Sequence, residues 1–344
     1  MKMFLVHCSN ASLGGAERSL LAELQTYQEN PNSCHFILPA RGALSQTLEK
    51  RNISYTVIPW PAGLRWFTQH QFWWQWTLLI FGPFYMYSFL RYILRLNRCL
   101  VKFDIQGRSV LSSGIKSHCL LLLLAPWFAK NMIFNIRDFI EPIVFRKCLS
   151  GLFGFFEIEV VANSKAVGKD YPHPTIKYPY VSLKRNYVNR RKEDGPVIIT
   201  HVAYFAPYKG QDLFLQYAQK ILDEGVNAQF WIVGDVIYPG NRYLKYKAKV
   251  LSLIDSLQIS DNVKVWGEVD DVQQLLEQSH VLLHCTRDPE PYGRVVMESL
   301  LCGCEVMCHK DSGVCEQLKA KDPEELSIPM NIGFEDKYIF VQRL

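Results

Sequence analysis

The chain has 344 residues, about twice the size of a common single domain, so two domains are expected. Hydrophobic residues make up 49% of it and charged residues 21%, which excludes disordered, collagen-like and coiled-coil proteins. The ten cysteines are irregularly spaced and form no disulfide framework. The first eight residues predict a strand and not a secretory signal, so we expect a reducing, cytoplasmic setting.

Charge is divided unevenly along the chain. Residues 1–185 carry 21 basic and 10 acidic side chains, a net charge of +11, whereas residues 186–344 carry 17 and 23, a net charge of −6. This asymmetry predicts two domains with different partners. No RNA- or DNA-binding motif accompanies the basic half, so no nucleic acid is expected. An anionic membrane surface or a phosphate-bearing substrate fits the charge better.

Short apolar runs alternate with helical patterns, an order typical of a parallel α/β sheet. In the first half the predicted strands are Met3–His7, Cys34–Leu38, Tyr55–Ile58, Asp104–Gln106, Met132–Ile136 and Glu159–Ala162. The apolar positions of a first helix are Leu20, Leu21, Leu24 and Tyr27. The short run Cys119–Ala129 contains Pro126, which is expected to end it, and predicts a buried helix.

An aromatic segment lies within the first half. Residues 66–90 contain no charged side chain, and eleven of these 25 residues are aromatic, including Trp66, Trp73, Trp74 and Trp76. Gly82-Pro83 interrupts the run, and the best apolar stretch is shorter than the roughly 20 residues that cross a bilayer. Three arginines follow at helical spacing: Arg91, Arg95 and Arg98. We predict a segment at the membrane surface; the alternative is a pair of aromatic-rich core helices.

The second half begins after a polar, charge-dense stretch at residues 184–196, which predicts a linker. Beyond it the predicted strands are Val197–Val202, Gln229–Val233, Val263–Trp266, Val281–Leu283 and Glu305–Cys308. The predicted helices are Leu213–Leu222 and Tyr243–Leu257. The sequence therefore predicts two Rossmann-like domains, residues 1–185 and 186–344, with the ligand in a cleft between them.

Two turns offer groups that bind anions. Gly14 and Gly15 lie where a loop enters the first helix, so their amides can point at a phosphate, although such pairs also occur for geometry alone. No GxGxxG fingerprint of a nicotinamide-cofactor site is present. Lys209-Gly210 directly precedes a predicted helix, and a lysine there can neutralise a phosphate. The alternative is a solvated lysine at a helix start.

Two glutamates near the end of the chain form the most specific pattern. Glu290 and Glu298 lie eight residues apart around Tyr292-Gly293. On a helix this interval is roughly 12 Å, a distance that suits one carboxylate at a sugar and the other at a ribose, with a diphosphate between them. We expect Pro291 at the helix start and the amides near Gly293 on phosphate oxygens.

A metal site is not expected. Five candidate ligands cluster in the sequence: Cys302, Cys304, Cys308, His309 and Cys315. Their spacing matches no usual zinc pattern, and residues 302–308 predict a buried turn and strand. Asp270-Asp271 is expected to cap a helix and not to hold a metal-bound diphosphate.

These motifs together resemble the retaining GT-B glycosyltransferases of the group 1, or family 4, type. The matching segments are GGAE at 14–17, VVANS at 160–164, PYKG at 207–210, WIVGD at 231–235, VKVWGEVDD at 263–271, EPYGRVVMES at 290–299 and SGVCE at 312–316. The resemblance implies an α/β, GT-B fold, with two Rossmann-like domains facing each other across a cleft. The first domain would contact the acceptor and the membrane, and the second would bind the donor.

The resemblance also implies roles for individual residues. Glu290 would contact hydroxyls of the donor sugar and Glu298 the ribose, while Lys209 and amides of the two turns hold the diphosphate. The implied donor-binding residues are Gly14, Gly15, Lys209, Gly234, Glu290, Tyr292, Gly293, Arg294 and Glu298. The implied catalytic residues are Glu290, Lys209, Arg137 and Asp138. A nucleotide-diphosphate sugar is the implied co-substrate, with no cofactor and no metal.

The sequence departs from the family pattern in three places, and these departures bear on the reaction rate and on closure of the two domains. Tyr204 stands where many members have an arginine, and Arg137-Asp138 stand where many have a histidine. The chain also ends soon after residues 321–326, before the usual long final helix. The predicted function is retaining hexosyl transfer to a lipid-linked or glycan acceptor in cell-envelope polysaccharide, lipopolysaccharide or glycolipid synthesis, by a cytoplasmic, peripherally membrane-bound protein. The alternatives are a GT-B-shaped sugar-nucleotide epimerase and an inactive scaffold.

Overall fold

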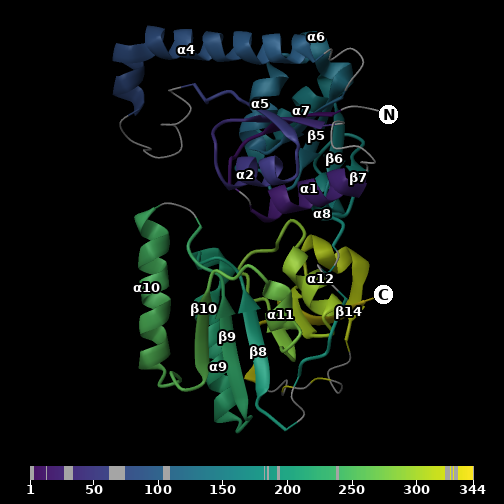
Figure 1. Cartoon of the computed structure of the whole chain (residues 1–344). Coiled ribbons are helices and arrows are strands. Elements are labelled where there is room, and N and C mark those ends of the chain that lie inside the picture. The colour runs from purple at the N-terminus through teal and green to yellow at the C-terminus, as the bar shows by residue number, and fades with distance from the viewer. Residues whose placement is uncertain are drawn as a thin grey trace. The chain divides into compact units, whose positions relative to one another are not determined.

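A computed structural model describes residues 4–12, 14–26, 34–61, 74–103, 109–181, 183, 186–191, 194–237, 240–321, 326, 328 and 332–343. The chain forms two compact units, Met1–Tyr180 and Val181–Leu344. Within the described residues each unit contains a seven-stranded sheet flanked by helices (Figure 1). Two Rossmann-like α/β units confirm the fold class predicted from the sequence.

The sheet of the first unit is parallel, with the strand order β3-β2-β1-β4-β5-β6-β7. Its strands are β1 (Phe4–Cys8), β2 (Cys34–Leu38), β3 (Ser54–Val57), β4 (Ser109–Ser113), β5 (Met132–Ile136), β6 (Glu159–Ala162) and β7 (Thr175–Ile176). Phe4 pairs with both Cys34 and Ser109, so β1 is central. The carboxyl ends of β1, β4 and β5 therefore meet at one edge.

Helices cover both faces of this sheet. They are α1 (Gly15–Thr26), α2 (Ala43–Lys50), α4 (Trp74–Lys102), α5 (Ile115–Leu122), α6 (Ala125–Phe128), α7 (Ile143–Phe155) and α8 (Lys165–Gly168). Because neighbouring strand residues point to opposite faces, Leu5 packs into the core formed with α4, α5 and α7, and Val6 into the core formed with α1 and α2. Both β1 side chains are almost fully buried.

Most of the strand predictions for the first half are confirmed, with small shifts at the ends. The predicted strand Asp104–Gln106 lies outside the described residues, and β4 was not predicted. The run Cys119–Ala129 is split between α5 and α6. Pro126 was expected to end a helix, but it lies in the first turn of α6, where its missing N–H costs no helix hydrogen bond.

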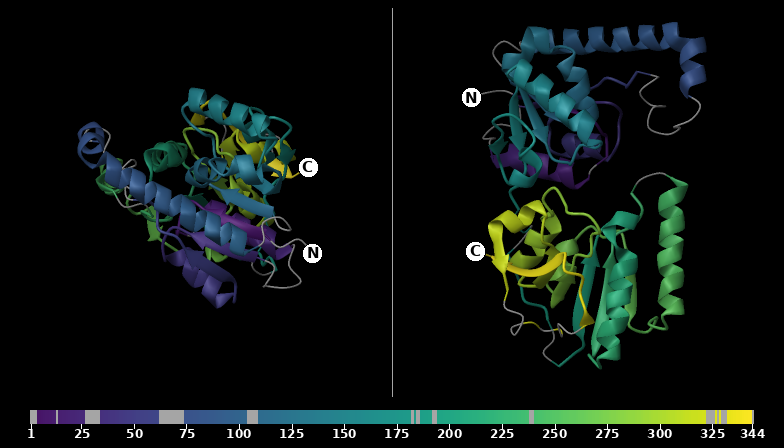
Figure 2. Two further views of the ribbon diagram at one scale, coloured as in Figure 1. Left: turned by 90° about the horizontal axis from the view of Figure 1, so that it is seen from above. Right: turned by 180° about the vertical axis from the view of Figure 1, so that it is seen from behind.

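The long helix α4 continues through Gly82-Pro83, which therefore does not end it. The helix bends in its N-terminal part (Figures 1 and 2), as proline's missing donor and ring clash require. Trp66 and Trp73 lie outside the described residues. Farther along, Tyr92, Leu96 and Leu100 are buried against the sheet on one face. Within the described part of the chain, no helix combines the length and apolar character needed to cross a bilayer.

The sheet of the second unit has the order β10-β9-β8-β11-β12-β14-β13. Its strands are β8 (Val197–Val202), β9 (Ala228–Val233), β10 (Val263–Gly267), β11 (Val281–Leu283), β12 (Glu305–His309), β13 (Leu318–Ala320) and β14 (Tyr338–Arg343). The first five are parallel and confirm the five predicted strands. The pairings of β14 with β12 and with β13 are antiparallel, and neither of these last two strands was predicted.

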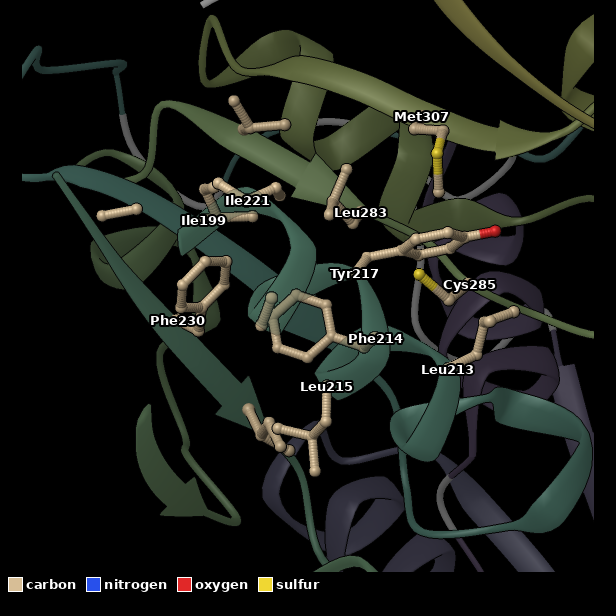
Figure 3. Close-up of a cluster of buried hydrophobic side chains, with 14 of the residues drawn as sticks. Ile199, Leu213, Phe214, Leu215, Tyr217, Ile221, Phe230, Leu283, Cys285 and Met307 are labelled. Carbon is tan, nitrogen blue, oxygen red and sulfur yellow. The ribbon is translucent and has the colours of Figure 1, made fainter. Parts of the chain in front are cut away.

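The core of the second unit fixes the turn before its first helix. The helices are α9 (Gln211–Asp223), α10 (Asn241–Ser256), α11 (Val272–Leu276) and α12 (Arg294–Leu301), with short 3₁₀ turns η4 (Pro207–Lys209) and η5 (Gly313–Gln317). Figure 3 shows Phe214 of α9 among Ile199, Phe230 and Leu283 of three strands. All four side chains are fully buried, so α9 has little freedom to shift on the sheet.

Candidate functional site

Two loops at the carboxyl ends of β8 and β11 are tied together beside α9. Gly210 has a φ of +75° and packs so closely against the carbonyl oxygen of Cys285 that a Cβ atom there would lie 1.9 Å from it. Arg287 donates from its backbone N–H to the carbonyl of Tyr208 (2.9 Å) and from its side chain to the carbonyl of Pro207 (3.2 Å). Only glycine fits at position 210, and the close approach places η4 next to the loop after β11.

This junction brings together Lys209 and Glu290, two residues predicted for the same ligand. The Lys209 ammonium donates to Glu290 Oε1, and both side chains are only 15% exposed. The ammonium also lies 5.1 Å from the ring centroid of Tyr204 and 5.6 Å from that of Tyr208, within cation–π range. Tyr204 stands where the family pattern predicts an arginine, a second cation beside Lys209. Instead of a second charge, it places its aromatic ring near the Lys209 ammonium.

Glu290 is held from several directions. Its Oε2 lies 3.1 Å from Nε2 of the buried His284, so the two carboxylate oxygens face different partners. Its backbone N–H donates to Ser312 Oγ (3.0 Å), and its carbonyl accepts from Gly313 N–H (3.0 Å). Burial alone raises the pKa of Glu290, but the Lys209 charge and the His284 ring outweigh it and hold that pKa well below its usual range. The carboxylate is therefore ionised near neutral pH.

The segment after Glu290 differs from the predicted helix. Helix α12 begins at Arg294, because Gly293 adopts a φ of +97° that stops the helix from extending backward. Pro291 is not at the helix start, and Glu290 lies in the preceding loop, so the expected helical rise of about 12 Å between the two glutamates was wrong. Glu298 is on α12 and pairs with Arg294 at 3.0 Å.

Two further predicted donor-binding residues have bonds within the protein. The buried Tyr292 donates from its hydroxyl to Gln317 Oε1 at 2.6 Å. Gly234, with a φ of +129°, donates its N–H to the carbonyl of Gly267 at 2.8 Å, and a Cβ on it would lie 2.3 Å from the carbonyl oxygen of Ala203. Close packing therefore requires a glycine at position 234, because this residue lies against the start of the loop that leads to Lys209.

In the first unit, the glycine turn already contacts an anionic group of the protein. The N–H of Gly14 donates to Glu17 Oε2 at 3.0 Å, and burial raises the pKa of Glu17. Gly15 begins α1, and among the described residues beyond its chain neighbours and its own helix no atom lies within 4 Å of where its Cβ would be. A phosphate at this turn would have to displace the Glu17 carboxylate or bind beside it.

Arg137 and Asp138 line a pocket of about 360 Å³ at the carboxyl ends of β1, β4 and β5. Ser9, Ser113 and His118 line the same pocket. Arg137 donates to Glu23 Oε2 at 2.6 Å, and this ion pair is buried, with side-chain exposures of 6% and 10%. The pocket lies where Rossmann-like sheets bind ligands.

The sequence did not single out several of these residues. His284 directly follows a buried strand, but a lone histidine there is more often part of the core than of a site. Ser312 opens the SGVCE segment, which was matched without a role for its first residue. Glu17 is the last residue of the GGAE segment, which was matched without a role for it, and His118 lay in no motif.

Four of the five candidate metal ligands form two separate pairs. Cys302 and Cys304 contact Arg191, through the carbonyl of one (2.7 Å) and the sulfur of the other (3.8 Å). Cys308 and Cys315 contact each other through their sulfur atoms at 3.5 Å. Among the residues that the structure describes, no group of three or more His, Cys, Asp or Glu side chains is arranged to hold a metal ion.

Comparison with known proteins relates the second unit to a family. Residues 184–331 match the family described as glycosyl transferases group 1, and they include Lys209, Gly234 and the whole segment Glu290–Glu298. A curated relative, the N-acetyl-alpha-D-glucosaminyl L-malate synthase of Bacillus anthracis, is 29% identical over 146 residues. These residues are 41% of this chain and 36% of the relative, so the match spans about a third of the relative's length.

Solved structures are similar over nearly the whole chain. Anabaena HepE in complex with UDP and glucose matches with a TM-score of 0.72 at 18% identity, covering 96% of this chain and 86% of that one. The lipopolysaccharide outer core galactosyltransferase WaaB matches with a TM-score of 0.60 at 15% identity, covering 89% and 80%. The chain therefore has the GT-B fold, and the similarity to the group 1 glycosyltransferase family lies in residues 184–331.

Proposed function

We propose that this chain is a retaining, family 4 glycosyltransferase that moves a hexose from a nucleoside-diphosphate sugar to a membrane-associated, lipid-linked or glycan acceptor. The reaction belongs to the synthesis of a cell-envelope polysaccharide, lipopolysaccharide or glycolipid. The observation that carries the proposal is the cluster of Lys209, Glu290 and His284, which lies in the region that matches the group 1 family.

The chemistry follows from where charge develops. As the nucleoside diphosphate leaves, negative charge grows on its β-phosphate, and a cation placed beforehand stabilises that charge. Lys209 supplies the cation by exchanging the Glu290 carboxylate for the diphosphate, together with amides around Gly293. Glu290 keeps its contact with His284 on Oε2, which leaves Oε1 to accept a hydroxyl of the donor sugar. Glu298 on α12 is assigned to the ribose.

Retention requires that the acceptor attacks from the side of the leaving group. In the proposed mechanism a diphosphate oxygen takes the proton of the attacking hydroxyl, so the protein needs no covalent nucleophile. The lysine charge and the N-terminus of α12 provide the positive potential that a metal ion supplies in other transferases. Arg137 and Asp138 are assigned to the acceptor, in the pocket of the first unit.

The relatives suggest which donors to test first. The structures of HepE contain UDP, UDP with glucose, and UDP-glucose, and the Bacillus relative is named for an N-acetylglucosaminyl group. UDP-glucose and UDP-N-acetylglucosamine are therefore the first two candidates. GDP-sugars serve as the comparison, because discrimination between one base or sugar and another depends on loop contacts and not on the motif residues.

The described part of α4 supports the proposed membrane contact. Phe84, Met86, Tyr87 and Leu90 are exposed, with more than half of the surface of each open to solvent. Arg91, Arg95 and Arg98 are exposed on the following turns and, with Tyr87, Leu90 and Leu94, line a groove of about 440 Å³. Aromatic and aliphatic side chains beside cations are the composition that binds an anionic interface. We propose peripheral association with the cytoplasmic face of a membrane.

Incubation of the protein with a panel of nucleotide sugars, with and without membrane extract, tests the function. We expect nucleoside diphosphate release that depends on the extract, and a product whose anomeric NMR coupling equals that of the donor. Isomerised sugar without an acceptor would indicate the epimerase. Absence of both turnover and nucleotide binding would indicate a scaffold.

A further inference from the structure

Two cysteine thiols lie in contact beside the Glu290 segment. Cys308 is a fully buried residue of β12, and Cys315 is a partly exposed residue of η5. Their sulfur atoms are 3.5 Å apart, and the Cys315 thiol also lies 3.5 Å from the carbonyl oxygen of His309. A disulfide has a sulfur–sulfur distance of about 2.05 Å, so a shift of roughly 1.5 Å brings the two atoms to bonding distance.

The two thiols differ in acidity and access. The hydrogen bond from Cys308 lowers the pKa of Cys315, whereas the same contact and burial raise that of Cys308. The more acidic thiol therefore belongs to the residue that is partly exposed, and the other thiol to a buried residue. A thiolate attacks an oxidant faster than a thiol does, and a second thiol in contact resolves the product. This division of roles is that of an attacking and a resolving cysteine.

The backbone between these cysteines supports the Glu290 segment. Ser312 Oγ accepts from Glu290 N–H (3.0 Å), Gly313 N–H donates to the Glu290 carbonyl (3.0 Å), and Val314 N–H donates to the Tyr292 carbonyl (2.8 Å). Movement of Cys315 toward Cys308 pulls on η5, which begins at Gly313. A disulfide between the two sulfurs would therefore disturb the hydrogen bonds that residues 312–314 make to Glu290 and Tyr292.

We propose that Cys308 and Cys315 are a reversible dithiol–disulfide modification site that acts on the Glu290 segment. A peroxide is the oxidant: the Cys315 thiolate attacks it and becomes a sulfenic acid, and the peroxide oxygen that leaves takes up a proton as water. The Cys308 sulfur then attacks the sulfenic sulfur and loses its proton, and a second water leaves. Two thiols and one hydrogen peroxide give one disulfide and two waters. A dithiol reductant reverses the change.

Peptide mapping of the whole protein tests the site without reference to its activity. After treatment with hydrogen peroxide, we expect a peptide pair joined through Cys308 and Cys315, two hydrogens lighter than the reduced pair and restored by dithiothreitol. Cys315→Ser should abolish the crosslink, and Cys148→Ser, which removes an exposed thiol of α7, should leave it unchanged. A crosslink to another cysteine, or oxidation of Cys148 with both site thiols intact, would overturn the proposal.

Hydrogen exchange tests the coupling, also without a nucleotide. The amides of Glu290, Gly313 and Val314 should exchange several-fold faster in the oxidised protein, and Cys315→Ser should show no change on peroxide treatment. Unchanged exchange in a fully crosslinked sample would refute the coupling. A further consequence rests on the proposed function: oxidation should weaken UDP binding reversibly. If reduced protein binds no UDP while the crosslink and the exchange change appear, the proposed function fails and this site stands.

Discussion

The two units of the molecule arrange their polar site residues differently. In the second unit, Lys209 and Glu290, both predicted for one ligand, contact each other across two loops. In the first unit, the predicted groups contact residues that were not predicted. Arg137 pairs with Glu23 of α1, and the Gly14 amide binds the Glu17 carboxylate.

The two ion pairs therefore have different expected roles. We expect a ligand to rearrange the Lys209–Glu290 pair, and the Arg137–Glu23 pair mainly to stabilise the fold. The Lys209 and Glu290 side chains both lie in loops and keep some exposure. In the proposed mechanism a diphosphate replaces Glu290 as the partner of Lys209, while His284 stays on the carboxylate. The Arg137–Glu23 pair is more deeply buried, and breaking such a pair leaves an uncompensated charge that costs about 3–5 kcal/mol. Arg137 is therefore expected to position the pocket more than to move within it.

The largest expected effect is that of Lys209→Ala. It removes the cation proposed for the diphosphate and leaves the Glu290 carboxylate buried without its main partner, which costs about 3 kcal/mol of unfolding free energy. UDP affinity and transfer rate should both fall strongly. The double variant Lys209→Ala/Glu290→Gln should recover most of the stability but not the UDP affinity. Wild-type titration curves with both UDP and GDP would refute the phosphate assignment.

Glu290→Gln should separate sugar positioning from nucleotide binding. It removes the proposed charge-assisted hydrogen bond to the sugar, worth about 2–3 kcal/mol, which should lower the rate by about 30- to 150-fold. UDP affinity should stay nearly unchanged, because Lys209 and His284 remain. Glu298→Gln is the matched control on α12 and should weaken UDP binding instead. An equal loss of UDP affinity in Glu290→Gln would show that its role is placed wrongly.

Lowering the pH should destabilise each unit through a buried histidine. His118, hydrogen-bonded to Ser112 in the first unit, and His201, bonded to the Leu283 carbonyl in the second, are both fully buried, and burial lowers the pKa of each to about 3. Between about pH 6.5 and pH 3 each histidine is protonated in the unfolded chain but not in the folded one. The free energy of unfolding therefore falls as the pH drops from about 6.5 toward 3. Each histidine contributes a slope of about 1.4 kcal/mol per pH unit.

The measurement is urea unfolding of the variants at several pH values between 7 and 4. His118→Gln should flatten the pH dependence of the transition of the first unit, and His201→Gln that of the second. A slope that neither variant changes would mean that other groups take up the protons. A single transition flattened by both would mean that the two units unfold together.

The fold was predictable where burial leaves a direct mark on the sequence. Cys34–Leu38, apolar except for His35, and Val281–Leu283 are buried strands, and strands buried on both faces are nearly continuous apolar runs. Strand β4 was not predicted, because three of its five residues are serines. The hydroxyl of Ser112 bonds to Ser117 and His118, partners that only the folded chain brings together.

The candidate site was predictable only in its residue types. The motif identified Lys209 and Glu290, but their contact depends on Gly210 packing against the Cys285 carbonyl, which local sequence does not encode. The positive φ of Gly293 moves the start of α12 past Pro291, a choice that a helix pattern alone does not reveal. His284 needed the partner carboxylate to distinguish it from a core histidine.

The smallest expected effect is on membrane binding by the exposed arginines of α4. Here the two units differ in net charge, because the first is basic and the second is acidic. Each cation near an anionic membrane contributes about 1 kcal/mol, so Arg91→Ala, Arg95→Ala and Arg98→Ala should each weaken binding to anionic vesicles about fivefold. Arg242→Ala, which also removes an exposed arginine but from α10 of the acidic unit, should have no effect. Sedimentation with vesicles at low and high salt measures this, and binding should weaken in salt without vanishing, because Phe84 and Tyr87 add an apolar contribution. Wild-type protein that stays in the supernatant at low salt would mean that this face does not bind membranes and that the acceptor is a soluble molecule.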